Sequence, residues 1–159
     1  MDVDLRSFPA LPRETVQRIT KSAGPFIQSL NIAGFVDIDS EKLMDLTNDL
    51  CLMTPQVSLS YTQLRNINLQ GCTGLTTRAL HHLLIRSRSL ETLNVKGLSA
   101  VTNTTCEVLA TYCAALRKLN MDRCANMDAE GVHFMAKTAT LRGEHLQLRE
   151  LHLTGLKHT

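Results

Sequence analysis

The chain lacks tryptophan, is poor in aromatic residues and has no long apolar run. Aromatics make up 4% of its 159 residues, too few for the stacking platforms that bind single-stranded nucleic acid. No stretch approaches the roughly 20 apolar residues that span a bilayer, and the acidic opening residues do not resemble a secretory leader. The net charge of +2, from 17 basic and 15 acidic residues, is small. We therefore expect neither nucleic acid nor a membrane as partner.

Motifs for catalysis and for metal binding are also missing. The sequence contains no HExxH, GxSxG, phosphate-binding loop or GxGxxG, so we expect no catalytic residue, no cofactor and no enzyme activity. No CxxC pair occurs, which argues against a metal site. An odd number of cysteines without a secretory leader predicts free, buried thiols in a reducing compartment, the cytoplasm or the nucleus. These cysteines are Cys51, Cys72, Cys106, Cys113 and Cys124.

What the chain does contain is a repeat. Five segments share the pattern Leu-x-x-Leu-x-Leu or a close variant, and their starts are separated by 37, 26, 26 and 32 residues. Within each segment, the fourth and sixth residues are apolar and alternate with polar ones, as in a short strand with one buried face. The segments are Ile27–Ile32, Leu64–Leu69, Leu90–Val95, Leu116–Met121 and Leu148–Leu153.

Each segment is followed by a turn and then by a helical pattern. The expected helix caps are Ser40, Thr76, Thr102 and Asp128, and apolar residues recur behind each cap at spacings of three and four. A strand–turn–helix unit cannot bury its own apolar face, but parallel stacking of such units makes one continuous core. The sequence therefore predicts an α/β right-handed curved solenoid with strands on the inner face and helices outside.

Two parts of the chain are expected to differ from the regular units. Residues 1–26 are predicted to form an N-terminal capping helix, and residues 27–159 the repeats, which start near 27, 64, 90, 116 and 148. The longer repeats are expected to carry loops at 54–63 and near 141–145. The last repeat is incomplete and should expose an edge strand with apolar core, so we expect either a fragment or an end covered by a partner.

The pattern Leu-x-x-Leu-x-Leu-x-x-Cys-x-x-Leu-Thr in Leu64–Thr76 resembles the cysteine-containing subtype of leucine-rich repeats. Leu90–Cys113 and Leu116–Asp128 are similar to it. The resemblance implies a horseshoe with parallel strands on the concave face and helices on the convex face. Its best-known bearers are F-box proteins of the leucine-rich class, which select substrates for cullin-based ubiquitin ligases, and residues 22–34 are similar to fungal members of this class. The implied function is substrate recognition in such a ligase.

An F-box itself is not found. Leu11–Glu14 resembles its opening, but the first repeat begins too soon afterwards and no tryptophan is present. A Skp-type adaptor is therefore expected as a partner only through an F-box outside this chain. Two alternatives stay open: a scaffold or regulatory protein outside ubiquitination, such as a cell-cycle or repair adaptor, and a ribonuclease-inhibitor-like or GTPase-regulating repeat protein, which the 26-residue spacing disfavours.

The strand positions that face away from the core are the candidate partner-binding sites. Their charged members number six basic residues against three acidic ones, and we expect the fourth and fifth strands to bind an acidic or phosphorylated segment of a protein substrate. The alternative is that these side chains are only solvated charges on a polar face and bind no partner. The asparagines between the strand leucines are expected to form a hydrogen-bonded ladder or a binding stripe. The candidates are Arg65, Asn68, Asn94, Lys96, Arg117, Lys118, Asn120, Asp122, Arg123, Arg149 and His152, together with the acidic Glu91 and Glu150.

Overall fold

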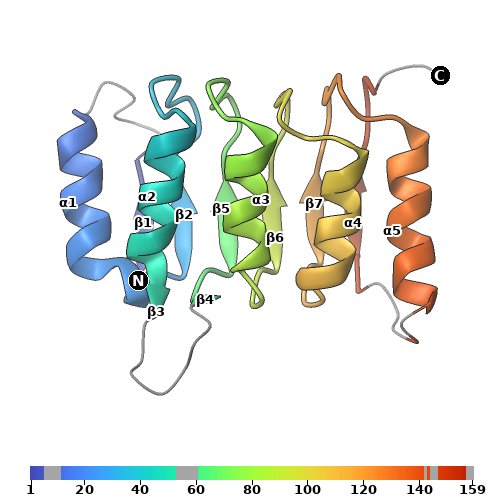
Figure 1. Ribbon diagram of the computed structural model, residues 1–159, viewed down its shortest axis with the longest axis horizontal. Coiled ribbons are helices and arrows are strands. Elements are labelled where there is room, and N and C mark those ends of the chain that lie inside the picture. Colours follow the sequence, from blue (N-terminus) through green and yellow to red (C-terminus); the bar gives the residue numbers. More distant parts are fainter. Residues whose placement is uncertain (6–11, 53–60, 142, 144–146, 157–159) are drawn as a thin grey trace.

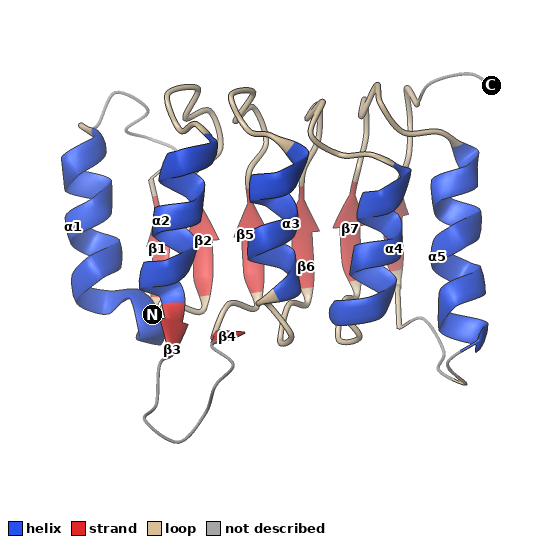
Figure 2. Cartoon of the chain, viewed as in Figure 1, coloured by secondary structure: helices blue, strands red, loops and turns tan. Residues whose placement is uncertain are grey.

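A six-stranded parallel sheet and a layer of helices make up the protein (Figures 1 and 2). The computed structural model describes residues 1–5, 12–52, 61–141, 143 and 147–156. The sheet has the order β1-β2-β5-β6-β7-β8, and the helices lie along one of its faces. The strands are β1 (Asp2–Asp4), β2 (Ser29–Asn31), β5 (Asn66–Asn68), β6 (Thr92–Asn94), β7 (Lys118–Asn120) and β8 (Glu150–His152); the helices are α1 (Arg13–Ala23), α2 (Ser40–Leu50), α3 (Thr77–Ile85), α4 (Asn103–Tyr112) and α5 (Ala129–Leu141).

The five predicted strands are confirmed, and they pair in the register that the repeat predicts. Leu30, Ile67, Leu93, Leu119 and Leu151 form a single row across the sheet. The first four of these side chains are each 1% exposed, because helices cover them. Leu151, in the last strand, is 38% exposed. The apolar row therefore forms the centre of the core, except at its C-terminal end.

A strand that the sequence analysis did not predict precedes the capping helix. β1 pairs in parallel with β2 and brings Val3 into the leucine row next to Leu30. A three-residue strand with two aspartates gives too short a period-two signal to be recognised alone. α1 packs against α2 beyond this strand, and Val16 of α1 is 4% exposed. The first 26 residues thus contribute a strand as well as the predicted helix.

The helix N-termini follow the predicted caps with one correction. Thr76 accepts a hydrogen bond from the Ala79 amide, and Asp128 accepts one from the Glu130 amide. In α2 the cap is Asp39 rather than Ser40, because the Asp39 carboxylate accepts the Lys42 amide at 3.0 Å. The Ser40 hydroxyl instead accepts the Thr76 amide of the next repeat at 2.9 Å.

All five cysteines are buried and free, as predicted. The thiol of Cys72 donates to the Ile32 carbonyl at 3.1 Å, and that of Cys124 donates to the Val95 carbonyl at 3.3 Å. Each contact joins a repeat to the strand before it. Burial raises the pKa of Cys72 to about 11 and that of Cys113 to about 12. A cysteine therefore serves here as a small apolar residue with a donor for a buried carbonyl.

The chain just before and within the long first repeat contains additional structure. A short 3-10 helix, η1 (Gly24–Phe26), leads into β2. Two further strands, β3 (Cys51–Leu52) and β4 (Tyr61–Thr62), pair antiparallel outside the main sheet, and the Arg88 guanidinium lies over the Tyr61 ring. Most of the loop predicted at 54–63 lies outside the described residues. Of the insertion expected near 141–145, the structure describes Leu141, which ends α5, and residue 143.

Candidate partner-binding face

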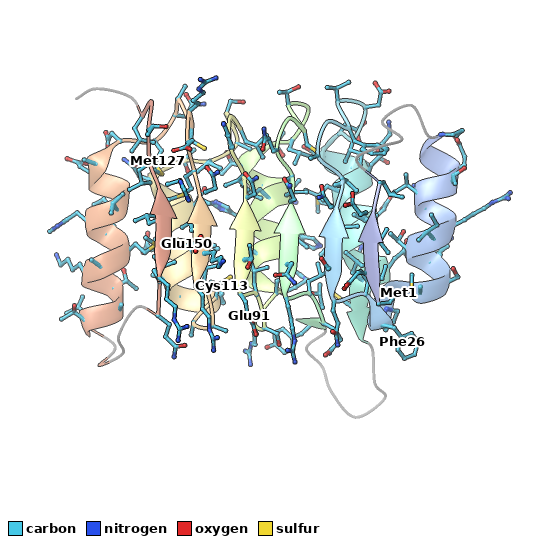
Figure 3. All side chains as sticks on the ribbon, turned by 180° about the vertical axis from the view of Figure 1, so that it is seen from behind. Met1, Phe26, Glu91, Cys113, Met127 and Glu150 are labelled. Carbon is cyan, nitrogen blue, oxygen red and sulfur yellow. The ribbon has the colours of Figure 1, made fainter. Side chains whose placement is uncertain are left out.

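The sheet face opposite the helices carries the predicted binding residues (Figure 3). We call it the uncovered face, formed by the non-core positions of β1, β2 and β5–β8. Within the described residues, no helix lies over it. Alternate strand residues point to opposite faces, so the residues on either side of the buried leucine row must lie here. In register, neighbouring repeats place equivalent side chains side by side, which produces rows that cross the strands.

The central row of this face consists of asparagines, which do not form the predicted ladder. The side-chain oxygens of Asn68, Asn94 and Asn120 each accept the backbone amide two residues later, at 3.0 to 3.1 Å. Among the described residues, the amide groups of these asparagines form no bonds to one another; Asn94 donates to Gln70 instead. Asparagine suits this position because its short side chain can accept a hydrogen bond from the backbone amide two residues later and so stabilise a turn. His152 continues the row in β8.

A second row, at the N-terminal ends of the strands, is rich in charge. Backbone hydrogen bonds place Arg65, Glu91, Arg117 and Arg149 in succession on neighbouring strands. Arg65 forms an ion pair with Glu91 at 3.9 Å. Arg117 and Arg149 are exposed neighbours, and the Arg149 amide donates to the Arg117 carbonyl at 2.7 Å. Neither guanidinium has an ion pair or hydrogen bond within the described part of the chain. Arg117 directly precedes β7 and Arg149 directly precedes β8, and like charges at such neighbouring positions repel and favour a nearby anion.

Other charges on the uncovered face already have partners. Lys118 forms an ion pair with Glu150 at 3.2 Å. The carboxylate of Asp122 accepts the Thr154 amide at 2.7 Å, and the hydrogen bonds from Thr154 lower the pKa of Asp122. The neighbouring His152 and Lys96 lower the pKa of Asp122 further. These groups are therefore less free to bind a partner than Arg117 and Arg149.

Arg123 lies at the opposite end of the strands, so the four predicted basic residues do not form a single site. It lies six positions after Arg117, which corresponds to at most roughly 20 Å along an extended chain. Its backbone φ is 57°, a left-handed conformation that glycines adopt at the equivalent places of the other repeats. The predicted cluster therefore divides into a pair, Arg117 and Arg149, and a distant Arg123, with Lys118 held by Glu150.

The charge of the uncovered face is also closer to balance than the sequence indicated. β1 adds Asp2 and Asp4 beside β2, so the face carries five acidic residues rather than three, against six basic ones. The carboxylates of β1 lie at one end of the sheet, and Arg117 and Arg149 lie near the other. The face is therefore polarised along the stack rather than uniformly basic. Sequence reasoning missed this because it did not recognise β1.

The helical layer has one feature that the sequence did not indicate. A groove of about 240 Å³ lies between α1 and α2, lined by Gln17, Lys21, Asp45, Asn48 and Asp49. Its polar lining with charges of both signs gives no chemical preference for a ligand. The described residues contain no group of histidine, cysteine or acidic side chains arranged to hold a metal ion.

The adjacent histidines of α3 contact different helices. Nε2 of His81 lies 2.8 Å from the Thr105 hydroxyl in α4, and Nε2 of His82 lies 3.3 Å from the side-chain oxygen of Asn48 in α2. Burial lowers the pKa of both rings. The two side chains therefore bridge neighbouring repeats.

Among the helices that the structure describes, none has the length and apolar character needed to cross a bilayer.

Comparison with known proteins supports the fold. The C-terminal domain of tropomodulin from Caenorhabditis elegans superimposes with a TM-score of 0.62 at 15% identity, over 89% of this chain and 82% of that one. At this identity, the likeness concerns the fold alone. No protein-family model and no curated protein matches the sequence.

Proposed function

We propose that the chain is a leucine-rich repeat solenoid of the right-handed horseshoe type that binds a protein partner on its uncovered face. The in-register rows of strand leucines, the helices along one side and the likeness to the tropomodulin domain support this architecture. In a horseshoe the uncovered face is the concave one, and an extended inner surface is suited to binding. The chain acts in this proposal by binding, without catalysis.

The observation that carries the binding proposal is the unpaired arginine couple at β7 and β8. Arg117 and Arg149 are exposed neighbours without an anionic partner in the described structure. A guanidinium offers planar, paired donors that match carboxylate and phosphate oxygens. The partner of this proposal is an acidic or phosphorylated segment of a protein. Nearby Glu91 and Glu150 already pair with Arg65 and Lys118, which leaves the two arginines available for it.

The size of the face limits the kind of partner that this proposal allows. Six strands at about 4.8 Å spacing give a sheet about 24 Å wide. With short strands, the area is smaller than the roughly 800 Å² per partner of a standard interface. An arginine-anchored segment of a few residues fits this area, whereas a large folded partner requires further contacts.

Titration with labelled peptides tests the binding site. The probes are an acidic peptide with one phosphoserine, its unphosphorylated form and a version in which lysine replaces the acidic residues. We expect binding of the phosphopeptide to weaken about tenfold or more in Arg117→Glu and in Arg149→Glu, which corresponds to about 1.4 kcal/mol. Arg78→Glu, the same charge change at an exposed position of helix α3, is the matched control. Equal affinities for all variants would remove the arginine site.

The sequence resemblance supports a more specific role, substrate recognition in a cullin-based ubiquitin ligase. Affinity purification of the natural protein from its own cells tests it. Recovery of a Skp-type adaptor and a cullin is the expected result. Their absence, with other partners retained, would favour the scaffold or regulatory alternative. The peptide experiment stands apart from this one, because a scaffold can bind the same acidic segment.

A further inference from the structure

The asparagine row in the middle of the uncovered face offers hydrogen-bond donors to a partner. Asn31, Asn68, Asn94 and Asn120 lie side by side in register on β2, β5, β6 and β7. The side-chain oxygen of each accepts the backbone amide two residues later, at 3.0 to 3.2 Å. A backbone amide can only donate, so it fixes the orientation of each side chain. The oxygen faces the turn, and the NH₂ group is left to face a partner.

Most of these NH₂ groups have no acceptor within the protein. Asn94 donates to the side-chain oxygen of Gln70 at 3.2 Å. In the part of the chain that the structure describes, the NH₂ groups of the other three asparagines have no acceptor. All four side chains are partly exposed. Each of the four strands has a strand on both sides, so the row does not depend on either end of the sheet.

The surroundings of the row indicate which acceptors it suits. On β2, β5 and β6, the residues two positions before the asparagines are Ser29, Asn66 and Thr92, which are uncharged. A main-chain carbonyl is the neutral acceptor that every residue of a partner carries. We propose that the asparagine row binds the main-chain carbonyls of the partner segment, which lies across the strands. This inference rests on the proposed function, because the segment is the acidic one that contacts Arg117.

The spacing of the donors specifies the conformation of the segment. Asn68 and Asn120 lie two strands apart, which corresponds to about 9.6 Å. In a polyproline II segment, carbonyls on the same side recur every three residues, or about 9.3 Å, whereas in a β-strand they recur about every 6.7 Å. Asn31 and Asn94 are spaced alike, but Asn94 already donates to Gln70. The segment is therefore held in the polyproline II conformation, with two of its carbonyls at Asn68 and Asn120.

A pair of variants on one strand tests the role of the donors. The probe is the acidic phosphoserine peptide of the arginine titration, labelled with fluorescein and followed by anisotropy. Asn68→Asp keeps an oxygen for the turn and removes the NH₂ group. Asn66→Asp adds the same charge on the same strand and face, at a side chain without a hydrogen bond in the described structure. Asn68→Asp should weaken binding about three- to tenfold more than Asn66→Asp does. Thermal melting checks that both variants keep the fold.

Two versions of the peptide test the conformation of the segment. In one, proline replaces the residues between the acidic positions, and in the other glycine replaces them. Proline favours polyproline II and removes N–H groups that this row does not need, so the proline version should bind about threefold or more tighter.

The variant Arg117→Glu separates this inference from the proposed function. Equal losses in Asn68→Asp and Asn66→Asp, or a glycine version that binds as tightly as the proline version, would overturn the role of the asparagines. If Arg117→Glu still weakened binding in that case, the arginine site would remain. No measurable binding of the parent peptide would overturn both proposals.

Discussion

The two ends of the sheet differ in how completely they are covered. At the N-terminal end, β1 lies beside β2 and α1 packs against α2, so Val3 is 7% exposed and Val16 of α1 is 4% exposed. At the C-terminal end, β8 follows the last helix, and Leu151 is 38% exposed. Val3 and Leu151 belong to the same apolar row. Their difference therefore comes from what lies beside each strand and not from the residue type.

This difference shows that a repeat stabilises the chain through its neighbours. Complete burial of a leucine side chain contributes about 1.5 to 3 kcal/mol, and a side chain that stays partly exposed gains less. In a repeat architecture the interface terms between units carry much of the stability. β1 and β8 each pair with a single strand, but Val3 in β1 is 7% exposed whereas Leu151 in β8 is 38% exposed. We therefore expect the C-terminal end to open before the N-terminal end.

The largest expected effect comes from shortening the same side chain at two places in the row. Leu93→Ala, in the buried middle, should lower the free energy of unfolding by about 3 kcal/mol, because it leaves a cavity that its neighbours cannot fill. Leu151→Ala, at the exposed end, should cost less than about 1 kcal/mol. Urea unfolding followed by circular dichroism gives both values. Equal losses would show that the two positions are equally buried in solution.

The buried thiols test whether water reaches the core between the two ends of the sheet. Burial raises the pKa of Cys113 from about 9 to about 12, so above pH 9 the unfolded chain loses this proton while the folded chain keeps it. Stability is therefore unaffected by this thiol below pH 9 and falls by about 1.4 kcal/mol per pH unit above it. In Cys113→Ala, the free energy of unfolding should decline less steeply above pH 9, by about 1.4 kcal/mol per pH unit. Urea unfolding between pH 8 and pH 11 measures this slope. An unchanged slope would mean that water reaches Cys113.

The smallest expected effect concerns the turn beside the C-terminal end. Arg123 has φ 57°, whereas Gly34, Gly71 and Gly97 hold the equivalent left-handed positions. A side chain in this conformation costs about 1 to 2 kcal/mol, and the greater freedom of glycine in the unfolded chain offsets part of the gain. Arg123→Gly should raise stability by up to about 1 kcal/mol, and Gly97→Arg should lower it by a similar amount, as measured by thermal melting. A loss of stability in Arg123→Gly would reveal a structural contact of this side chain.

Much of the fold could be predicted from the repeat alone. The spacing located the five strands with their register, the helices behind them and the buried cysteines, because side chains that recur in equivalent places must share one face. The strand at Asp2–Asp4 was missed because its period-two signal is three residues long. The helix cap at Ser40 was misplaced by one residue because an aspartate stands directly before it, and either side chain suits the position.

The candidate site was only partly predictable. The sequence placed Arg117 and Arg123 at the fourth predicted strand and Arg149 at the fifth, all on the inner face, but it could not tell which of them lie together. The strand register brings Arg117 and Arg149 side by side, and it leaves Arg123 at the other end of the strands. The asparagines show the same limit, because their position was predicted and their hydrogen-bond partners were not.

The sequence by itself determined which side of each strand is apolar, since the alternation of side chains along a strand follows from its backbone geometry. Only the tertiary structure decided which charges are paired, which strand begins the sheet and which leucine is left exposed. These depend on neighbours that are distant in sequence, and the free energy of burial or ion pairing is set by the surroundings of a side chain rather than by its identity.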